Sequence, residues 1–362
     1  MLERNVSEVP THPMRIVNAA SAFPKNAYEQ PTISGALSGY WRDQLPNPDF
    51  LDRLHGRTGV DQRFTVMPLQ SYVRANTFGK TNNIWIEHAQ ELGSEAICKA
   101  ITPVGLQPKD LAAFFFVSVT GVASPSIDAR LVNKMGLSPN IKRIPIFGLG
   151  CVAGAAGIAR AADYVRAYPD QVAILLSVEI CSLTWQRDDL SVANLISTGL
   201  FGDGAAAVVI AGANRDFAGP EIIDTRSVFY PNTEQVMGWD ISEHGFQIVL
   251  SPEVPTMVEL HLREDIDTLL AEHDLTRKDI SSWIIHTGGP KVLEAVQSAL
   301  DLPSSALEAS WECLRKVGNL SSASVLCVLE DFLMNRRGEP GTYSILAAMG
   351  PGFCSEVVLL KW

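Results

Sequence analysis

Cys151 has the clearest potential for chemistry in this chain of 362 residues. It follows two closely spaced glycines, Gly148 and Gly150, in the stretch FGLGCVAGAAGIARAAD. The Ala- and Gly-rich residues after it predict a helix that is packed closely on all sides. At the start of a helix, the helix dipole lowers the pKa of a thiol and favours the thiolate. The stretch therefore predicts an activated nucleophile, although a buried structural cysteine would also fit it.

Two further polar side chains stand where reactive groups are common. His286 ends the apolar run WIIH and precedes a turn that contains Gly288, so we expect it at the carboxyl end of a strand, where open α/β sheets bind ligands. Asn319 lies beside Ser321 in VGNLSSAS, and it could also be the N-cap of the helix that follows. The glycine-rich stretch AMGPGFC contains Gly350, and its backbone N–H groups could serve an oxyanion.

A cysteine, a histidine and an asparagine together allow two reaction types. Papain-like peptide hydrolysis is the first, and the interval of 135 residues from Cys151 to His286 (286 − 151) falls within its range. The C-G-S-C-W type of signature is missing, which argues against a protease. The second is acyl transfer through a thioester with decarboxylative carbon–carbon bond formation. There the thiolate carries the acyl group, and His with Asn meets the enolate without a metal.

The composition excludes several other classes of protein. Apolar residues make up 46% of the chain, enough for a large core, and the formal net charge of −11 argues against nucleic acid as a partner. The six cysteines include no CxxC pair, so neither a metal site nor a redox motif is indicated. No signal pattern and no apolar run of membrane-spanning length is evident. We expect a soluble, cytoplasmic protein.

The elements that must position these residues alternate between strand and helix. Strand patterns occur at 14–20, 111–118, 143–147, 171–178, 222–227, 280–285, 343–349 and 356–361, and residues 200–212 read as a turn followed by a strand. Helix patterns occur at 33–44, 83–100, 129–135, 153–163, 256–272, 291–300 and 321–337. The alternation predicts an α/β fold with a largely parallel buried sheet. Because the pattern restarts after residues 212–220, we expect an N-terminal half at 1–215 and a C-terminal half at 216–362. Residues 1–13 read as a loose leader.

Five motifs in this order resemble those of the type III polyketide synthases, the chalcone synthase-like enzymes of the thiolase fold: GLGCVAGAAG, LFGDGAAAVV, HTGGPKVLEAV, GNLSSASVLCVLE and MGPGF. The similarity covers residues 14–362. It implies a duplicated thiolase-like architecture with αβαβα layers, a homodimer, and CoA thioesters as substrates without a bound cofactor. It also implies that Cys151 carries the acyl group, that His286 pairs with it and stabilises the enolate, and that Asn319 orients the malonyl thioester and assists loss of CO2.

The resemblance also assigns residues around the substrate. Phe201 resembles the aromatic gatekeeper between the CoA tunnel and the cavity, while Ile248 stands where plant chalcone synthases have a second Phe. Cys181, followed by Thr184, stands where they have Thr, and Ser124 where they have Met in the loop that reaches the partner subunit. With these we group three residues beside the catalytic ones: Ser321, Gly288 and Gly350. The lost aromatic ring favours a fatty acyl-CoA starter, extended with malonyl-CoA and cyclised to a pyrone or a resorcinol.

Three arginines, Arg53, Arg57 and Arg63, could clamp the phosphates of CoA at the mouth of the tunnel, although such a run often forms a solvated face.

Two alternatives to a type III polyketide synthase stay open. A ketoacyl-ACP synthase III-type enzyme shares the Cys, His and Asn and performs one condensation. A non-catalytic partner subunit of the thiolase fold would belong to a different class.

Overall fold

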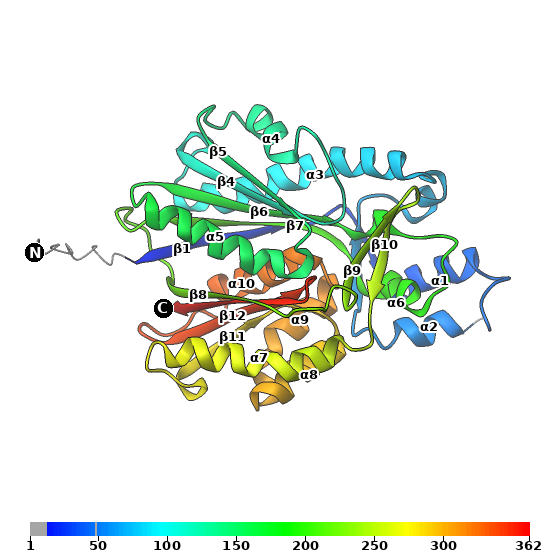
Figure 1. Cartoon of the computed structure of the whole chain (residues 1–362). Helices are drawn as coiled ribbons and strands as arrows, with labels where there is room; N and C mark the ends of the chain where they lie inside the picture. The colour runs from blue at the N-terminus through cyan, green and yellow to red at the C-terminus, as the bar shows by residue number, and fades with distance from the viewer. Residues whose placement is uncertain (1–12, 48) are drawn as a thin grey trace, which may run out of the picture.

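The computed structural model describes residues 13–47 and 49–362 (Figure 1). The leader predicted at 1–13 lies outside the described residues, apart from Pro13. No helix in the described ranges is long and apolar enough to cross a membrane.

The main sheet has nine strands. The N-terminal half of the chain supplies β1 (Met14–Ala22), β4 (Leu111–Ser118), β5 (Lys142–Phe147), β6 (Val172–Ile180) and β7 (Asp203–Ala211). The C-terminal half supplies β8 (Glu221–Phe229), β11 (Ile280–Ile285), β12 (Tyr343–Gly350) and β13 (Cys354–Lys361). Their order is β11-β12-β13-β8-β1-β7-β6-β4-β5. The two sets meet at the pairs Met14↔Ile222 and Arg15↔Glu221, so the sheet consists of two halves joined at a narrow contact.

The prediction of a largely parallel sheet is wrong. β4 runs parallel to β5 and β6, and β11 runs parallel to β12. All pairings of β1, β7, β8 and β13 are antiparallel. β7, for example, is buried throughout, so its largely apolar sequence looks the same in either direction and carries no information on strand direction.

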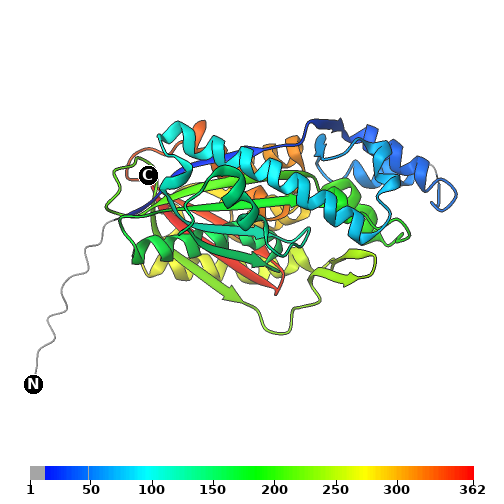
Figure 2. The ribbon, with the colours of Figure 1, turned by 90° about the horizontal axis from the view of Figure 1, so that it is seen from above.

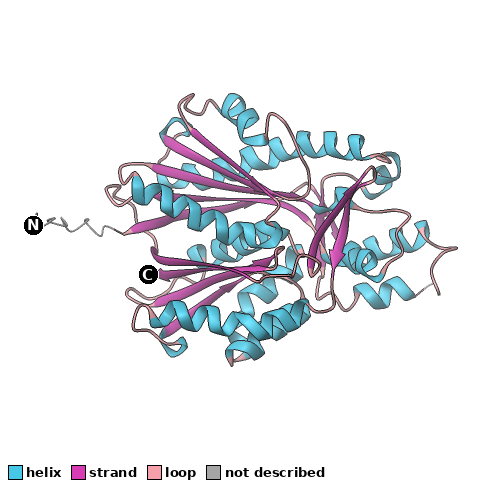
Figure 3. Cartoon of the chain, viewed as in Figure 1, coloured by secondary structure: helices cyan, strands magenta, loops and turns pink. Residues whose placement is uncertain are grey.

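The helices form three layers around the two half-sheets (Figures 1 and 3). On the outer side of the N-terminal half lie α3 (Phe78–Ile101) and α4 (Ile127–Met135). The layer between the half-sheets contains α5 (Ala153–Ala167) and α10 (Ser324–Met334). The C-terminal half is covered by α7 (Val254–Ala271), α8 (Pro290–Leu300) and α9 (Glu308–Val317). This αβαβα layering is the thiolase-like architecture that the sequence motifs imply.

Small residues let α5 fit between the half-sheets. A Cβ atom added at Gly154 would lie 2.3 Å from the carbonyl oxygen of Ser322, and one at Gly157 would lie 2.5 Å from Cδ1 of Leu175. Larger residues would therefore push the helix away from both neighbours. The predicted crowding of this helix is confirmed, because ten of its 15 residues, between Ala153 and Val165, are buried.

Several elements that the sequence patterns did not predict gather at one end of the molecule, far from the chain termini (Figure 2). They are α2 (Phe50–His55), α6 (Val192–Leu200), the strand pair β2 (Asn26–Glu29) and β3 (Gln62–Thr65), and the hairpin β9 (Met237–Ser242) and β10 (Gly245–Leu250). Helix α1 (Gln30–Tyr40) lies with them, beginning three residues before its predicted start at residue 33 (33 − 30).

Candidate active site

Cys151 lies in a single 3-10 turn, Gly150–Val152, between the end of β5 and the start of α5. The predicted position at a helix start is therefore confirmed. Gly150 has a φ of +54°, and a Cβ atom there would lie 2.7 Å from Cδ of Pro351. Gly350 is equally close to this turn, since its added Cβ would lie 2.7 Å from the backbone N of Val152. The glycine-rich loop after β12 thus packs directly on the turn that holds the thiol.

His286 directly follows β11, as expected, and its backbone N–H donates a 3.0 Å hydrogen bond to the carbonyl oxygen of Ala347. The side chain is 5% exposed, yet neither ring nitrogen has a hydrogen-bond partner among the described residues. Buried polar atoms are nearly always satisfied. An imidazole without a partner is therefore a mark of a site that accepts a ligand.

Asn319 lies between α9 and the 3-10 turn Ser321–Ala323. Its backbone N–H donates to the carbonyl oxygen of Leu200 over 2.9 Å, which ties it to the residue before Phe201. Its Oδ1 accepts from the backbone N–H of Ser321 at 2.8 Å and from the hydroxyl of Ser324 at 3.3 Å. The amide oxygen therefore fixes the following turn, and the amide Nδ2 remains as a donor for a ligand.

The structure brings Cys151, His286 and Asn319 to the wall of one cavity, together with Phe201 and Gly288. This space, the catalytic cavity, has an empty volume of about 560 Å³ counted out to its mouth. Its other lining residues are apolar: Leu200, Met237, Leu250, Val254, Val258, Leu262, Ile285, Val292, Val296, Ala347, Ala348, Met349 and Phe353. The thiol sulfur of Cys151 lies 3.7 Å from Oγ of Ser321, which places Ser321 beside the candidate nucleophile as well.

A second cavity, here called the outer cavity, lies on the other side of Phe201 and has an empty volume of about 860 Å³. Cys181, Thr184 and Ile248 line it, as expected for substrate-contacting residues. Unlike the catalytic cavity, it also presents many polar side chains: Arg63, Thr65, Tyr72, Ser182, Asn194, Ser197 and Thr198. Phe201 lines both spaces and therefore separates them, which is the position that a gatekeeper requires.

One face of the β9–β10 hairpin roofs both cavities. Trp239 pairs with Ile248, and both line the outer cavity. Met237 pairs with Leu250 two residues along, and both line the catalytic cavity. The sequence analysis singled out Ile248 alone. The alternation of Met237, Trp239, Ile248 and Leu250 on a two-residue period was the signal that could have identified the other three.

Burial sets the protonation of the candidate pair. It raises the pKa of the Cys151 thiol to about 12, although the contact with Ser321 acts in the opposite direction. It also lowers the pKa of His286 to about 4. The resting site therefore holds a neutral thiol and a neutral imidazole. The lowered thiol pKa expected from the helix start is wrong for this resting state, because the enclosing apolar wall disfavours the charged form more strongly than the helix start favours it.

The three arginines expected at a phosphate clamp do not lie together. Arg53 and Arg57 are exposed, and Arg53 donates to Oδ1 of Asn47 at 3.0 Å. Arg63 is 5% exposed and donates from Nη1 to the carbonyl oxygen of Phe201 at 2.8 Å. Its assignment to a surface clamp is therefore corrected, because it sits behind the gatekeeper and burial lowers its pKa to about 10.

Ser124 lines neither cavity. It is exposed in the loop between β4 and α4, so its expected contact with the substrate is not formed within one chain, and its approach to a partner subunit stays a prediction.

Two buried carboxyl groups support the site from behind. Glu179 accepts hydrogen bonds from the hydroxyl groups of Thr120 and Ser322, and burial raises its pKa to about 7. Sequence reasoning missed it, although an acidic residue inside the apolar run QVAILLSVEI was a usable signal. Asp203 accepts from the backbone N–H groups of Val66 and Ser182, at 2.8 Å each, so it ties β7 to the end of β3 and to the turn that follows β6.

Comparisons with known proteins agree with this architecture. The family models for chalcone and stilbene synthases match residues 15–214 with the N-terminal domain and residues 221–362 with the C-terminal domain. A 1,3,6,8-tetrahydroxynaphthalene synthase of Streptomyces peucetius subsp. caesius is 47% identical over 345 residues, covering 94% of this chain and 91% of that protein. A putative chalcone synthase of Bacillus subtilis (strain 168) is 40% identical over 314 residues, covering 84% of this chain and 86% of that protein.

Among solved structures, the 1,3,6,8-tetrahydroxynaphthalene synthase of Streptomyces coelicolor A3(2), a bacterial type III polyketide synthase, superposes with a TM-score of 0.90. The two sequences are 32% identical, and the match covers 96% of this chain and 99% of that one.

Proposed function

The chain belongs to the chalcone and stilbene synthase family and is a type III polyketide synthase, an acyltransferase; on this premise we propose that it loads a fatty acyl group from CoA onto Cys151, extends it with malonyl-CoA and cyclises the product to a pyrone or a resorcinol. One observation carries the finer part of the proposal: apart from Cys151, His286, Asn319 and Gly288, the wall of the catalytic cavity consists of apolar side chains. Family membership speaks against the ketoacyl-ACP synthase III-type alternative and against a non-catalytic subunit.

Loading begins with removal of the thiol proton. His286 is a neutral base with both ring nitrogens free of protein partners, and it lines the same cavity as the thiol. As the acyl thioester enters, His286 accepts the proton of Cys151, and the thiolate sulfur attacks the thioester carbonyl carbon. The bond from that carbon to the CoA sulfur breaks, and CoA leaves with the proton from His286.

Extension uses His286 and Asn319 as hydrogen-bond donors to the malonyl unit. Loss of CO2 from malonyl-CoA leaves an enolate, whose oxygen accepts hydrogen bonds from the ring N–H of neutral His286 and from Nδ2 of Asn319. The enolate carbon attacks the carbonyl carbon of the acyl group on Cys151, and the cysteine sulfur leaves. The fixed amide of Asn319 supports this role, because Oδ1 is already bound by Ser321 and Ser324, which orients Nδ2.

An aliphatic starter suits this wall on energetic grounds. Burying each methylene contributes about 0.8 kcal/mol, and the side chains of Val254, Val258 and Val292 offer apolar contacts without hydrogen-bonding groups. A 4-hydroxylated aromatic starter would need a partner for its hydroxyl, which this wall does not supply.

A second candidate is synthesis from malonyl-CoA alone, with an acetyl unit that arises by decarboxylation as the first group on Cys151. The specific observation in its favour is the 47% identity to a 1,3,6,8-tetrahydroxynaphthalene synthase. The two candidates differ in the first group loaded and share the catalytic residues.

We also propose that the chain works as a homodimer and that Arg53 and Arg57 contact the phosphates of CoA. β4 and β5 end side by side; Phe147, the last residue of β5, is 50% exposed, and Val122, in the loop after β4, is 40% exposed. Exposed apolar side chains near the Ser124 loop favour a protein contact there. Light scattering on the purified protein tests the dimer.

Product analysis tests the proposed function. The protein is incubated with malonyl-CoA and an equimolar mixture of butanoyl-, octanoyl-, dodecanoyl- and 4-coumaroyl-CoA, and the products are identified by liquid chromatography and mass spectrometry. We expect alkyl pyrones or alkylresorcinols to dominate. A mixture dominated by a 4-coumaroyl product, or by a product built from malonyl units alone, would reject the fatty acyl starter.

A further inference from the structure

The buried side chain of Asp265 lies behind the loop Gly350–Phe353, and we propose that it is a positioning residue for the condensation step: through Tyr230 and Ser355 it holds this loop against the turn of Cys151. Asp265 itself lines neither cavity. The inference rests on the proposed extension of an acyl group on Cys151 with malonyl-CoA and goes beyond it, because it names a residue that sets the balance between extension and release. It does not depend on which starter is loaded.

Asp265 lies on the inner face of α7 and is 6% exposed. Its Oδ2 accepts hydrogen bonds from the hydroxyl groups of Tyr230 and Ser355, the latter over 2.6 Å. Burial and the bond to Asp265 raise the pKa of Tyr230, so the tyrosine hydroxyl keeps the proton that it donates. The two partners of this carboxylate are therefore neutral donors.

A buried carboxylate whose partners are hydroxyl groups costs stability, because its charge loses water without gaining a cation. Apolar side chains alone could pack α7 on the sheet at a lower cost. The carboxylate adds direction instead, since each hydrogen bond that it accepts fixes the position of one hydroxyl group.

Both hydroxyl groups belong to segments that hold Phe353. Ser355 follows Phe353 by two residues (355 − 353) at the start of β13. Tyr230 directly follows β8, and its backbone N–H donates to the carbonyl oxygen of Phe353 over 2.9 Å. The hydroxyl of Thr233 donates to the carbonyl oxygen of Tyr230 over 2.5 Å and accepts from the backbone N–H of Phe353. Both backbone polar groups of Phe353 are thus bonded to the segment that Asp265 fixes.

The loop that ends at Phe353 touches the nucleophile turn. Phe353 lines the catalytic cavity together with Cys151. Pro351 packs against Gly150, the residue before Cys151, so closely that an added Cβ atom at Gly150 would lie 2.7 Å from Cδ of Pro351. Contacts as tight as this transmit a displacement. A shift of the loop therefore moves Cys151 relative to the other two catalytic side chains.

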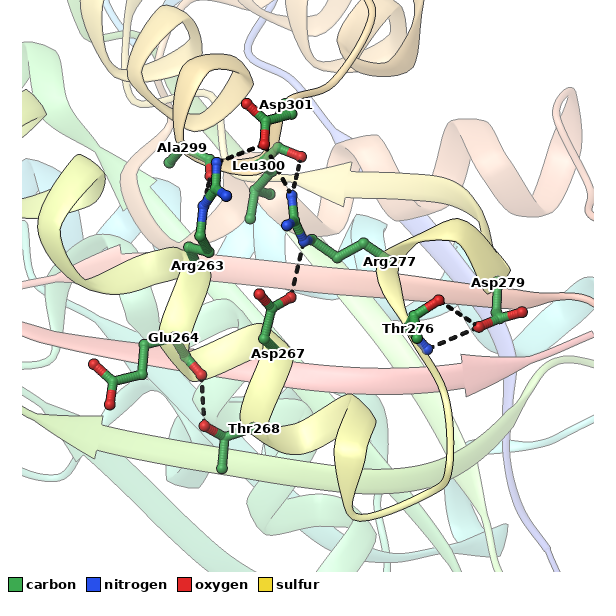
Figure 4. Close-up of polar contacts among 10 residues, drawn as sticks. All are labelled: Arg263, Glu264, Asp267, Thr268, Thr276, Arg277, Asp279, Ala299, Leu300 and Asp301. Carbon is green, nitrogen blue, oxygen red and sulfur yellow. Dashed lines mark hydrogen bonds and ion pairs between the residues drawn. The ribbon is translucent and has the colours of Figure 1, made fainter.

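The outer side of α7 is fixed independently (Figure 4). Arg277 donates to the carbonyl oxygen of Leu300 at 2.5 Å and to Asp267 at 2.9 Å, which ties α7 to the C-terminal end of α8. Asp267 and Asp265 are two positions apart, or about 200° around a helix, so they lie on nearly opposite faces of α7. The outer bonds can therefore be broken without removing a partner of Asp265.

Extension and release compete for the same thioester. In extension, the malonyl enolate carbon attacks the acyl carbonyl carbon on Cys151, so the sulfur and the malonyl unit must be aligned. In release as a pyrone, an enol oxygen of the chain attacks its own thioester carbonyl carbon, the bond to sulfur breaks, and the enol proton passes to the sulfur. Release needs no second substrate in position. Displacement of Cys151 therefore slows extension more than release, and the products become shorter.

Product ratios test the inference, because they do not depend on how much of the enzyme is folded. Tyr230→Phe and Ser355→Ala each remove one hydroxyl group from Asp265, and Arg277→Gln breaks the outer bonds of α7 as the matched control. Each protein receives malonyl-CoA with octanoyl-CoA, or malonyl-CoA alone. Liquid chromatography and mass spectrometry then give the ratio of the main wild-type product to all shorter products, free starter acid included.

We expect this ratio to fall about threefold or more in Tyr230→Phe and Ser355→Ala, since a misplacement of about 1 Å can cost about a hundredfold in rate. Arg277→Gln should keep the wild-type ratio even where its melting temperature falls. Asp265→Asn retains an acceptor oxygen for one hydroxyl group, so its ratio should lie between those of wild type and Asp265→Ala. If Tyr230→Phe does not fold, Ser355→Ala is the smaller change and decides the test.

Wild-type ratios in Ser355→Ala and Asp265→Asn would overturn the inference, and so would an equal fall in Arg277→Gln. The proposed function would stand in both cases. A wild-type protein that forms products from malonyl-CoA alone but none from octanoyl-CoA would reject only the fatty acyl starter. A wild-type protein that forms no product in either reaction would overturn the proposed function and this inference together.

Discussion

Nη1 of Arg63 lies 2.8 Å from the carbonyl oxygen of Phe201, so a buried guanidinium holds the residue that separates the two cavities. Nε of the same group donates to Oε1 of Gln30 at 3.1 Å, which connects α1 to the gatekeeper. The negative charge of Asp203 favours the charged guanidinium, although burial acts more strongly in the opposite direction. Arg63 is therefore a positioning residue.

Arg63→Lys should destabilise the fold and disturb the gatekeeper, because an ammonium group cannot replace a planar fork that donates in two directions. Breaking such a buried network costs about 3 kcal/mol or more, measured as the free energy of unfolding in urea. Arg53→Lys on the exposed helix α2 is the matched control, and we expect no measurable loss there. Equal stabilities for both variants would contradict the role of Arg63.

Arg53→Ala and Arg57→Ala should raise the KM for acyl-CoA several-fold, with kcat changed little, because both arginines are exposed and free to meet phosphate groups. Acyl-pantetheine thioesters lack the nucleotide phosphates, so their KM should change less. Steady-state kinetics with both substrate types give the comparison. The same rise in KM for CoA and pantetheine thioesters would show that these arginines do not bind the nucleotide.

Alkylation of Cys151 by iodoacetamide should become faster as the pH rises from 7 to 10. Burial raises the pKa of this thiol to about 12, so the reactive thiolate grows in proportion to hydroxide over this range. Intact-protein mass spectrometry with Cys151→Ala as the control gives the rate at this residue. A rate that is already constant above pH 7 would instead report a preformed thiolate, with His286 carrying the proton.

His55 should make the protein less stable in mild acid. Its ring is buried between the hydroxyl of Ser34 and the carbonyl oxygen of Leu195, and burial, aided by Arg63, lowers its pKa to about 4. The unfolded chain binds the proton near pH 6.5, so stability is lost as the pH falls from about 6.5 to about 4, by at most ~3 kcal/mol.

Comparing wild type with His55→Asn in urea titrations at pH 7 and pH 4.5 isolates this contribution from those of other buried groups. We expect the variant to lose less stability than wild type between these pH values. Equal losses would mean that the proton reaches His55 in the folded state as readily as in the unfolded state.

The sequence predicted the elements that carry long apolar runs or long helical periods. β4 was predicted with its observed bounds because it is buried along nearly its whole length and is a nearly unbroken apolar segment, and β11 was predicted with its observed bounds from the apolar residues Trp283–Ile285 that end it. The ends of these strands placed Cys151 and His286 correctly. The resemblance in motifs then connected Asn319 to the same site.

Other features depend on contacts that a linear pattern does not encode. Ile241 shares the face of Met237 and Trp239 on β9 and yet is 57% exposed, so the alternation alone does not reveal which of these side chains the hairpin buries. Arg63 lies in a run of charged residues that reads as solvated, and its burial follows only from the packing of α1 and Phe201 around it. The antiparallel direction of β7 cannot be predicted from the sequence, because all nine of its residues are buried and its pattern has no exposed face to distinguish.

Mass spectrometry of the loaded enzyme tests the central claim most directly. Asn319→Ala should still accept a starter on Cys151 but lose about 10²–10³ in malonyl-CoA decarboxylation, as expected for removal of one enolate donor. The loaded group therefore accumulates. Given dodecanoyl-CoA and malonyl-CoA together, this variant should carry a dodecanoyl group on the peptide that contains Cys151, and Cys151→Ala should carry none. A malonyl or acetyl group alone on Cys151, with no dodecanoyl adduct, would contradict the account.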